Sequence, residues 1–218
     1  GVHNGVGRLV SAHEVEIEPS GEKLTAKNII VATGARPRPL PGYPFDGSRV
    51  INYRAALDLR EVPSSAVIIG AGPIGMEFAT LWSRYGSKIT VVEMMPNVLP
   101  NEDQDISVEA ERQFRRVGIE VRTAAKVEGI SLEENGVSAT VVQGEKKEVI
   151  SAQKVLMSIG FAPNSEELGL EATGVKTSRG YVEIDERMRT SVPNIYAIGD
   201  VTGKLGLAHV ASSQGMVA

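Results

Sequence analysis

The distribution of apolar residues along residues 64–93 predicts a strand, a helix and a second strand. Residues 67–69 form a short apolar run, which is typical of a parallel strand covered on both faces. Apolar side chains then recur at helical spacing over 74–85, and Gly86 follows as a residue type that commonly ends a helix. Residues 88–93 return to the pattern of a strand.

The residues that follow extend this pattern to a βαβαβ unit. Asn101 is a candidate N-cap, acidic residues come soon after it, and Gly118 stands where the second helix should end. This helix is expected to bury one apolar face, made of Ile106, Ala110, Phe114 and Val117. Residues 119–122 form a third strand. We therefore expect an α/β fold built on a parallel sheet.

Two segments of the chain resemble each other at a constant offset of 126 residues. They are "LTAKNIIVATGARP" (24–37) and "ISAQKVLMSIGFAP" (150–163). Short alternating strands precede both segments, and Asn135-Gly136 is a hairpin signal ahead of the second. The repeat predicts two similar domains, each a meander followed by a buried strand that ends in glycine. A chance likeness between two buried strands is the alternative.

The repeat also predicts that the first domain is incomplete. In the second copy, a glycine-rich loop at Gly70 lies 90 residues ahead of Gly160, whereas only 33 residues precede Gly34. A matching loop would lie upstream of residue 1. We therefore expect the front half of the first domain to be missing from this sequence.

Composition and charge argue against several classes of function. The net charge of −4 and the scattered Lys and Arg residues disfavour nucleic acid and anionic membranes as partners. No apolar run approaches the roughly 20 residues that span a bilayer, and no signal-peptide pattern is present, so we expect a cytoplasmic protein. The chain has no cysteine, which excludes disulfides, cysteine-ligated zinc and thiol chemistry from these residues. The three histidines have no metal-ligand spacing.

The sequence "GAGPIG" (70–75) is a dinucleotide-binding fingerprint, because it follows a predicted strand and opens a predicted helix. Gly70 permits the tight turn, and Gly72 lets a pyrophosphate approach the backbone. Gly75 allows the helix and the strand to pack closely, and the helix N-terminus favours the phosphates. A glycine-rich turn without a ligand is the alternative.

Three acidic residues are candidates for ligand contacts. Glu93 ends the second strand, 23 residues after Gly70, where its carboxylate would accept hydrogen bonds from an adenosine ribose and repel a 2′-phosphate. This favours NAD over NADP, and a solvent-exposed strand-end acid is the alternative. Glu77 either contacts the nicotinamide end of the cofactor or is an acid of the first helical turn that the macrodipole favours. Asp200 follows a buried strand, 195–198, which is expected to re-enter the first domain.

Together, these segments resemble the FAD- and NAD(P)-dependent disulfide oxidoreductases. The likeness lies in "NIIVATGARPRPLPG", "VIIGAGPIGMEFATLWSRYGSKITVVEMMPNVLPNEDQDIS", "VLMSIGFAPN" and "TSVPNIYAIGDVTGKLGLAHVASSQG", and covers essentially the whole chain. The acidic run after "VLP" and the segment "LAHVA" resemble the members that reoxidise dihydrolipoyl groups of 2-oxoacid dehydrogenase complexes. The resemblance implies that electrons pass from a dithiol to an enzyme disulfide, then to FAD and to NAD⁺.

The resemblance also implies which residues contact each cofactor. Those implied for NAD are Gly70, Gly72, Pro73, Ile74, Gly75, Glu77, Glu93 and Gly160. Those implied for FAD are Thr33, Gly34, Asp200, Ala208 and His209. The family's first FAD fingerprint, its pair of redox cysteines and its C-terminal dimerisation domain with a His-Glu pair have no counterpart in this sequence. No catalytic residue and no metal site is therefore assigned.

We accordingly expect a Rossmann-like NAD-binding domain, a βαβαβ unit plus a β-meander, inserted in an incomplete FAD-binding domain of the same type. Residues 43–162 would form the NAD-binding domain, and 1–42 and 163–218 the two remnants of the other. This would be the central part of a longer homodimeric enzyme whose partner is a dihydrolipoyl domain. The part alone is expected to be inactive and not to retain FAD. The alternatives are a stand-alone NAD-binding redox sensor, or part of an NADH oxidase or a ferredoxin reductase.

Overall fold

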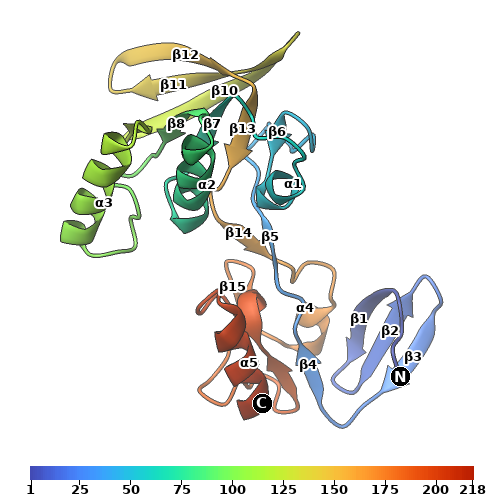
Figure 1. Ribbon diagram of the computed structural model, residues 1–218. Coiled ribbons are helices and arrows are strands. Elements are labelled where there is room, and N and C mark those ends of the chain that lie inside the picture. The colour runs from blue at the N-terminus through green and yellow to red at the C-terminus, as the bar shows by residue number, and fades with distance from the viewer. The chain divides into compact units, whose positions relative to one another are not determined.

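The computed structural model describes all residues, 1–218, and the chain divides into two compact units (Figure 1). The central unit is Pro37–Gly160, and the flanking unit combines Gly1–Arg36 with Phe161–Ala218. Each unit has a hydrophobic core of its own. None of the helices has the length and apolar character needed to cross a membrane.

The central unit is built on a five-stranded parallel sheet. Its strands lie in the order β6 (Val50–Ile51), β13 (Lys154–Met157), β7 (Ser65–Ile69), β8 (Lys88–Val92) and β9 (Glu120–Arg122). Its helices are α1 (Tyr53–Leu57), α2 (Pro73–Arg84) and α3 (Gln104–Arg116). An antiparallel meander completes it, formed by β10 (Ala125–Glu133), β11 (Gly136–Gln143) and β12 (Lys146–Ala152). The predicted α/β fold is confirmed.

The strands of this sheet are apolar on both faces because both faces are covered. In β7, Ala66 and Ile68 pack with residues of the helices, whereas Val67 and Ile69 pack with residues of the meander. Successive side chains of a strand point to opposite faces, so one continuous apolar run serves both layers. Leu156 in β13 belongs to the helix side in the same way.

Helix α3 differs from the sequence prediction in its start and in its buried face. Its N-cap is Asp103 rather than Asn101. Of the four positions predicted to be buried, two pack against the core, Ala110 and Phe114, and two are exposed, Ile106 and Val117. The face turned to the core runs through Ser107, which is fully buried. Ile106 is exposed because neighbouring positions of a helix point in different directions.

The hairpin between β10 and β11 is present, but its turn lies one residue earlier than predicted. Glu134 and Asn135 form the turn, and Gly136 already pairs with Glu133 as the first residue of β11. A Cβ on Gly136 would lie 2.5 Å from the carbonyl oxygen of Ala152 in the neighbouring strand. Glycine is therefore required at this position by the close approach of a backbone.

The flanking unit begins with an antiparallel meander, formed by β1 (Val6–Ser11), β2 (Glu14–Glu18) and β3 (Glu22–Thr25). Three strand pairs follow: β4 (Ile29–Val31) with β17 (Ile195–Ala197), β5 (Ala35–Pro37) with β14 (Phe161–Pro163), and β15 (Thr177–Ser178) with β16 (Tyr181–Val182). The helices are α4 (Leu170–Thr173), the short 3₁₀ helix η1 (Gly199–Thr202) and α5 (Ala208–Val217). The pair β4–β17 is parallel.

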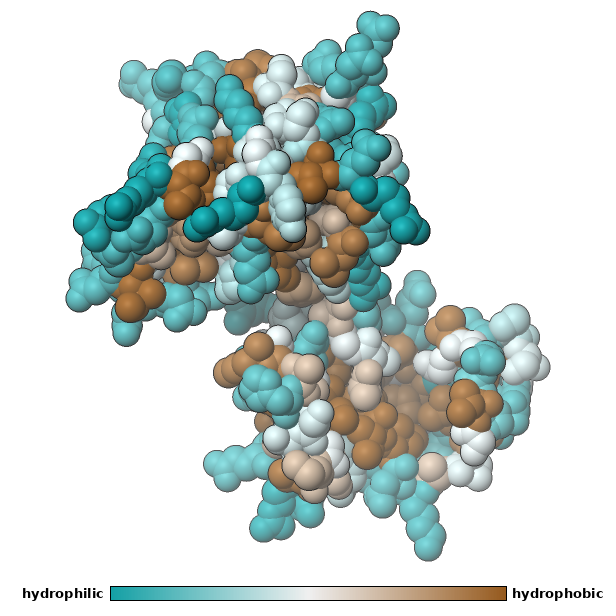
Figure 2. All heavy atoms as spheres, in the orientation of Figure 1, coloured by the Kyte–Doolittle hydropathy of each residue, from teal (hydrophilic) through white to brown (hydrophobic).

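Part of the apolar surface of the flanking unit is exposed. Figure 2 shows hydrophobic residues gathered in the middle of the visible face of this unit. In β4, Val31 is buried in the core, whereas Ile30, the middle residue of the strand, is half exposed. Leu205, Leu207 and Met216, in and ahead of α5, are exposed as well. The β4–β17 pair thus buries one face, with Val31, Ile195 and Ala197, and leaves Ile30 partly exposed on the other.

The internal repeat is confirmed by the structure. β4 and β13 occupy corresponding positions of the two copies, as do β5 and β14. In each unit a three-stranded meander precedes the strand, and a glycine with positive φ follows it, Gly34 (69°) and Gly160 (93°). β17 pairs with β4, so the strand that leads to Asp200 rejoins the first copy as expected.

The exposure of Ile106 can be tested by substitution. Ile106→Ala should change the free energy of unfolding by less than about 0.5 kcal/mol, because this side chain is 56% exposed. Ile89→Ala in β8 should cost about 2–5 kcal/mol, because Ile89 is 1% exposed. Urea unfolding followed by the fluorescence of Trp82, the chain's one tryptophan, reports on the central unit. Equal losses of unfolding free energy in the two variants would contradict the orientation of α3.

Candidate nucleotide-binding site

The segment between β7 and α2 is a tight loop in which two glycines are required by packing. Gly70 has a φ of 99°, and a Cβ there would lie 2.6 Å from the carbonyl oxygen of Ser158. A Cβ on Gly75 would collide with the carbonyl oxygen of Gly70 and would lie 2.6 Å from the Ser158 hydroxyl. The first turn of α2 therefore lies directly against the end of the sheet.

Gly72, the third glycine, faces open space instead. A Cβ built on Gly72 meets nothing within 4 Å, and its φ of −73° is accessible to any residue. Gly72 is also the N-cap of α2, and no side chain caps the N–H groups of the first turn. An open backbone position next to an uncapped helix N-terminus fits an approaching phosphate group.

Glu93 lies beside this loop, directly after β8. It is 8% exposed, so the alternative of a solvent-exposed acid is wrong. One carboxylate oxygen accepts a hydrogen bond from the backbone N–H of Ala71 (2.7 Å), and the other accepts one from that of Met95 (2.8 Å). Because a carboxylate offers about four acceptor positions, it can still accept hydrogen bonds from the hydroxyls of a ribose.

The other residues predicted to contact NAD lie at the same end of the sheet. β13 lies next to β7, and Gly160 follows β13 in an exposed position. Pro73 is exposed at the start of α2, and Ile74 is half-buried against the core. Glu77 is exposed, but it lies in the second turn of α2 and not in the first, because the helix begins at Pro73. The carboxyl ends of adjacent strands thus bring the predicted residues to one edge, which we call the loop edge.

The residues predicted to contact FAD follow two paired strands of the flanking unit. Thr33 and Gly34 come after β4 and Asp200 comes after β17, so all three lie at the carboxyl ends of parallel neighbours. Asp200 is exposed, and its carboxylate has no hydrogen-bond or ion-pair partner within the chain. Ala208 and His209 are exposed at the start of α5. The Asp200 carboxylate is therefore free to accept hydrogen bonds from a ligand.

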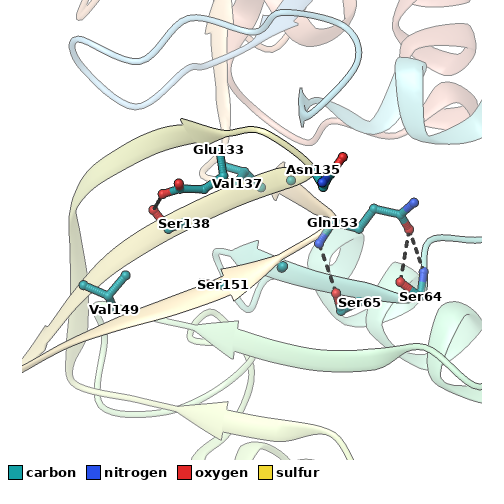
Figure 3. Close-up of a pocket in the computed structure, with 11 residues that line it drawn as sticks. Ser64, Ser65, Glu133, Asn135, Val137, Ser138, Val149, Ser151 and Gln153 are labelled. Carbon is teal, nitrogen blue, oxygen red and sulfur yellow. Dashed lines mark hydrogen bonds between the residues drawn. The ribbon is translucent and has the colours of Figure 1, made fainter.

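A surface groove of about 590 Å³ lies elsewhere in the central unit, at the amino end of β7 (Figure 3). Its polar side chains pair locally. The Ser138 hydroxyl donates to Glu133 (2.7 Å), and the side-chain oxygen of Gln153 accepts from the N–H of Ser64 (2.8 Å). None of the predicted site residues lines this groove, so the loop edge and the groove are separate features.

Comparisons with known proteins connect this arrangement to a family. The model of the pyridine nucleotide-disulphide oxidoreductase family matches residues 1–215. The chain belongs to this family. The family name refers to a pyridine nucleotide, and solved relatives are named as flavoproteins, so nicotinamide and flavin cofactors are general in it.

Curated members of the family resemble the chain over nearly its whole length. The dihydrolipoyl dehydrogenase of Chlorobaculum tepidum is 43% identical over 215 residues, which are 98% of this chain and 45% of that protein. That of Mycobacterium leprae is 44% identical over 222 residues, covering 99% of this chain and 47% of that protein. The chain spans about half the length of the curated relatives it matches.

Solved structures of family members share the fold. The HOCl-induced flavoprotein disulfide reductase RclA of Escherichia coli gives a TM-score of 0.86 at 29% identity, covering 98% of this chain and 48% of that one. LpdA of Mycobacterium tuberculosis gives a TM-score of 0.86 at 33% identity, with the same coverage of 98% and 48%.

In this family member, Ser158 belongs to the loop edge although no motif identified it. It follows β13, and its hydroxyl oxygen lies 3.0 Å from the carbonyl oxygen of Ile69 and 2.9 Å from that of Gly70. The repeat contained the one signal that could have drawn attention to it, because the aligned residue in the first copy is Ala32.

In the flanking unit, Asn164 and Gln214 hold the backbone at or next to residues that the family resemblance implies for FAD. Asn164 donates from its backbone N–H to the carbonyl of Gly34 and from its side-chain amide to the carbonyl of Thr33, both at 2.9 Å. The side-chain oxygen of buried Gln214 accepts from the N–H of Gly199 (2.7 Å), which precedes the predicted aspartate. Neither amide was predicted, because such long-range contacts leave no local pattern.

The contrast between Gly72 and Gly75 allows a paired test. Gly72→Ala should leave the melting temperature unchanged, because a φ of −73° suits alanine and the methyl group meets open space. It should weaken NADH binding by on the order of tenfold, about 1.4 kcal/mol, because the methyl group occupies the path of the pyrophosphate. Gly75→Ala should lower both the melting temperature and the NADH affinity, since its methyl group collides with backbone.

Thermal unfolding and fluorescence titration with NADH check both variants of this pair. An unchanged NADH affinity in Gly72→Ala would mean that the nucleotide does not approach the loop.

Proposed function

We propose that this chain supplies the NAD-binding part, and a portion of the FAD-binding part, of a dihydrolipoamide dehydrogenase. Such an enzyme oxidises a protein-bound dihydrolipoyl group with NAD⁺ and yields the lipoyl disulfide, NADH and a proton. The observation that carries the proposal is the 43–44% identity, over nearly the full chain, to proteins named dihydrolipoyl dehydrogenase. The lower identity of 29% to RclA supports another kind of flavoprotein reductase less well.

In this proposal the loop edge of the central unit binds NAD. The residues assigned to it are Gly70, Gly72, Pro73, Ile74, Gly75, Glu77, Glu93 and Gly160. The pyrophosphate lies against the open backbone at Gly72 and the uncapped start of α2. Glu93 accepts hydrogen bonds from the hydroxyls of the adenosine ribose. NADP is disfavoured, because its 2′-phosphate would bring further negative charge against a buried carboxylate.

The flanking unit is assigned to FAD through Thr33, Gly34, Asp200, Ala208 and His209. The exposed Asp200 carboxylate, which has no partner within the chain, would accept hydrogen bonds from the ribityl hydroxyls. A flavin held by these residues would supply two-electron redox chemistry between a dithiol and the nicotinamide. These 218 residues contain no cysteine, so the dithiol–disulfide step takes place on residues outside them.

We further propose a cytoplasmic homodimer that receives electrons from the dihydrolipoyl domain of a 2-oxoacid dehydrogenase complex. The 218 residues alone are then inactive towards dihydrolipoamide and do not retain FAD, because the thiols are lacking and the FAD pyrophosphate has no glycine loop to bind it.

The proposal is tested on the native protein, collected from its source with an antibody raised against this chain. It should reduce NAD⁺ when dihydrolipoamide is added. It should reduce NADP⁺ at least tenfold more slowly, which corresponds to a difference of about 1.4 kcal/mol in activation free energy. The matched control is the 218-residue chain, which should show neither this activity nor visible flavin absorbance. Oxidation of NADH by oxygen without any dihydrolipoamide activity would contradict the proposal and favour an NADH oxidase.

A further inference from the structure

One peptide unit of the glycine loop, Gly70–Ala71, is held from both of its ends. The carbonyl oxygen of Gly70 lies 2.9 Å from the hydroxyl oxygen of Ser158, which donates to it. The N–H of Ala71 donates to a carboxylate oxygen of Glu93 at 2.7 Å. The C=O and N–H of a trans peptide point in opposite directions within one rigid plane. The two side chains therefore fix the rotation of the whole plane.

This plane needs to be fixed because of the residue that begins it. Gly70 (φ 99°) has no Cβ, so its backbone dihedrals, among them the ψ that turns this plane, range more widely than those of other residues. Rotation of the plane would break the contacts to Ser158 and Glu93 together. The next carbonyl, that of Ala71, accepts a hydrogen bond from the N–H of Leu99 (2.8 Å), so consecutive peptides are anchored. The directions of the N–H groups that lead into α2 depend on these anchors.

The Ser158 side chain also fits the space that the loop leaves for it. Its hydroxyl would lie 2.6 Å from a Cβ on Gly75, so it occupies the room that this glycine provides. The same hydroxyl lies 3.0 Å from the carbonyl oxygen of Ile69, at the end of β7. A larger side chain at residue 158 would press on helix α2, and alanine would remove the hydrogen bond to Gly70.

The internal repeat indicates that the strand end does not itself require this hydroxyl. The residue aligned with Ser158 is Ala32, which follows β4 in the flanking unit and is exposed. The serine is found in the copy where the strand lies beside the glycine loop, and its hydroxyl is used there on the loop's own carbonyl.

We propose that Ser158 is a positioning residue of the nucleotide site. Together with Glu93 it locks the Gly70–Ala71 peptide, so that the loop presents its backbone to the pyrophosphate in a single orientation. The proposal rests on the assignment of the loop edge to NAD, and it gives Glu93 a second role besides its contact to the ribose.

The test compares Ser158→Ala with Ser138→Ala in the 218-residue chain. Ser138 is a matched control, because it is buried in the same unit, donates to Glu133 (2.7 Å) and lies in the groove of Figure 3 instead of at the loop. In Ser158→Ala, hydrogen exchange at the Ala71 amide should accelerate, and NADH affinity should fall, each by roughly fivefold or more for the loss of one hydrogen bond. Ser138→Ala should lower only the melting temperature.

Three results would overturn the inference or separate it from the proposed function. An unchanged rate of hydrogen exchange at the Ala71 amide in Ser158→Ala would show that Ser158 does not hold the Gly70–Ala71 peptide in place. An equal loss of NADH affinity in both variants would reduce Ser158 to a general stabilising residue and overturn its positioning role. If the unaltered chain binds no NADH, the assignment of the loop to NAD fails. The rate of hydrogen exchange at the Ala71 amide then decides by itself whether Ser158 fixes the Gly70–Ala71 peptide.

Discussion

The close approach of helix α2 to the end of β7 is the constraint on which the candidate site depends. No side chain fits at Gly75, because a Cβ there would meet the carbonyl oxygen of Gly70 and the hydroxyl of Ser158. This contact lets the helix begin at the very edge of the sheet, with open space at the Cβ position of Gly72 and no side-chain hydrogen bond to its first N–H groups. The positive end of the helix dipole then faces the place where a phosphate would lie.

Parallel pairing of strands supplies the other half of the arrangement. Because the carboxyl ends of parallel strands meet at one edge, residues far apart in the sequence, such as Gly72, Glu93 and Ser158, come together without any loop that has to reach them. The flanking unit follows the same rule, since β4 and β17 place Thr33 and Asp200 at neighbouring strand ends. One geometric rule, applied twice in a repeated architecture, thus generates both proposed cofactor positions.

The sequence alone predicted the elements whose local signals agree with their packing. The glycine loop, the apolar strands and the repeat all show this agreement, and the family assignment follows from them. Predictions were wrong where tertiary contacts decide. Helix α3 is turned so that Ile106 is exposed, and Gly136 is required by the carbonyl of Ala152 and not by a turn. Ser158 was missed because a hydroxyl that bonds a carbonyl 88 residues away leaves no periodic signal.

A crystal structure of the chain with NADH would decide whether the loop edge is a pyridine-nucleotide site. We expect the pyrophosphate to lie against Gly72 and the first turn of α2, with ribose hydroxyls donating to Glu93. Ordered NADH bound elsewhere, for example in the groove lined by Ser138 and Gln153, would contradict it.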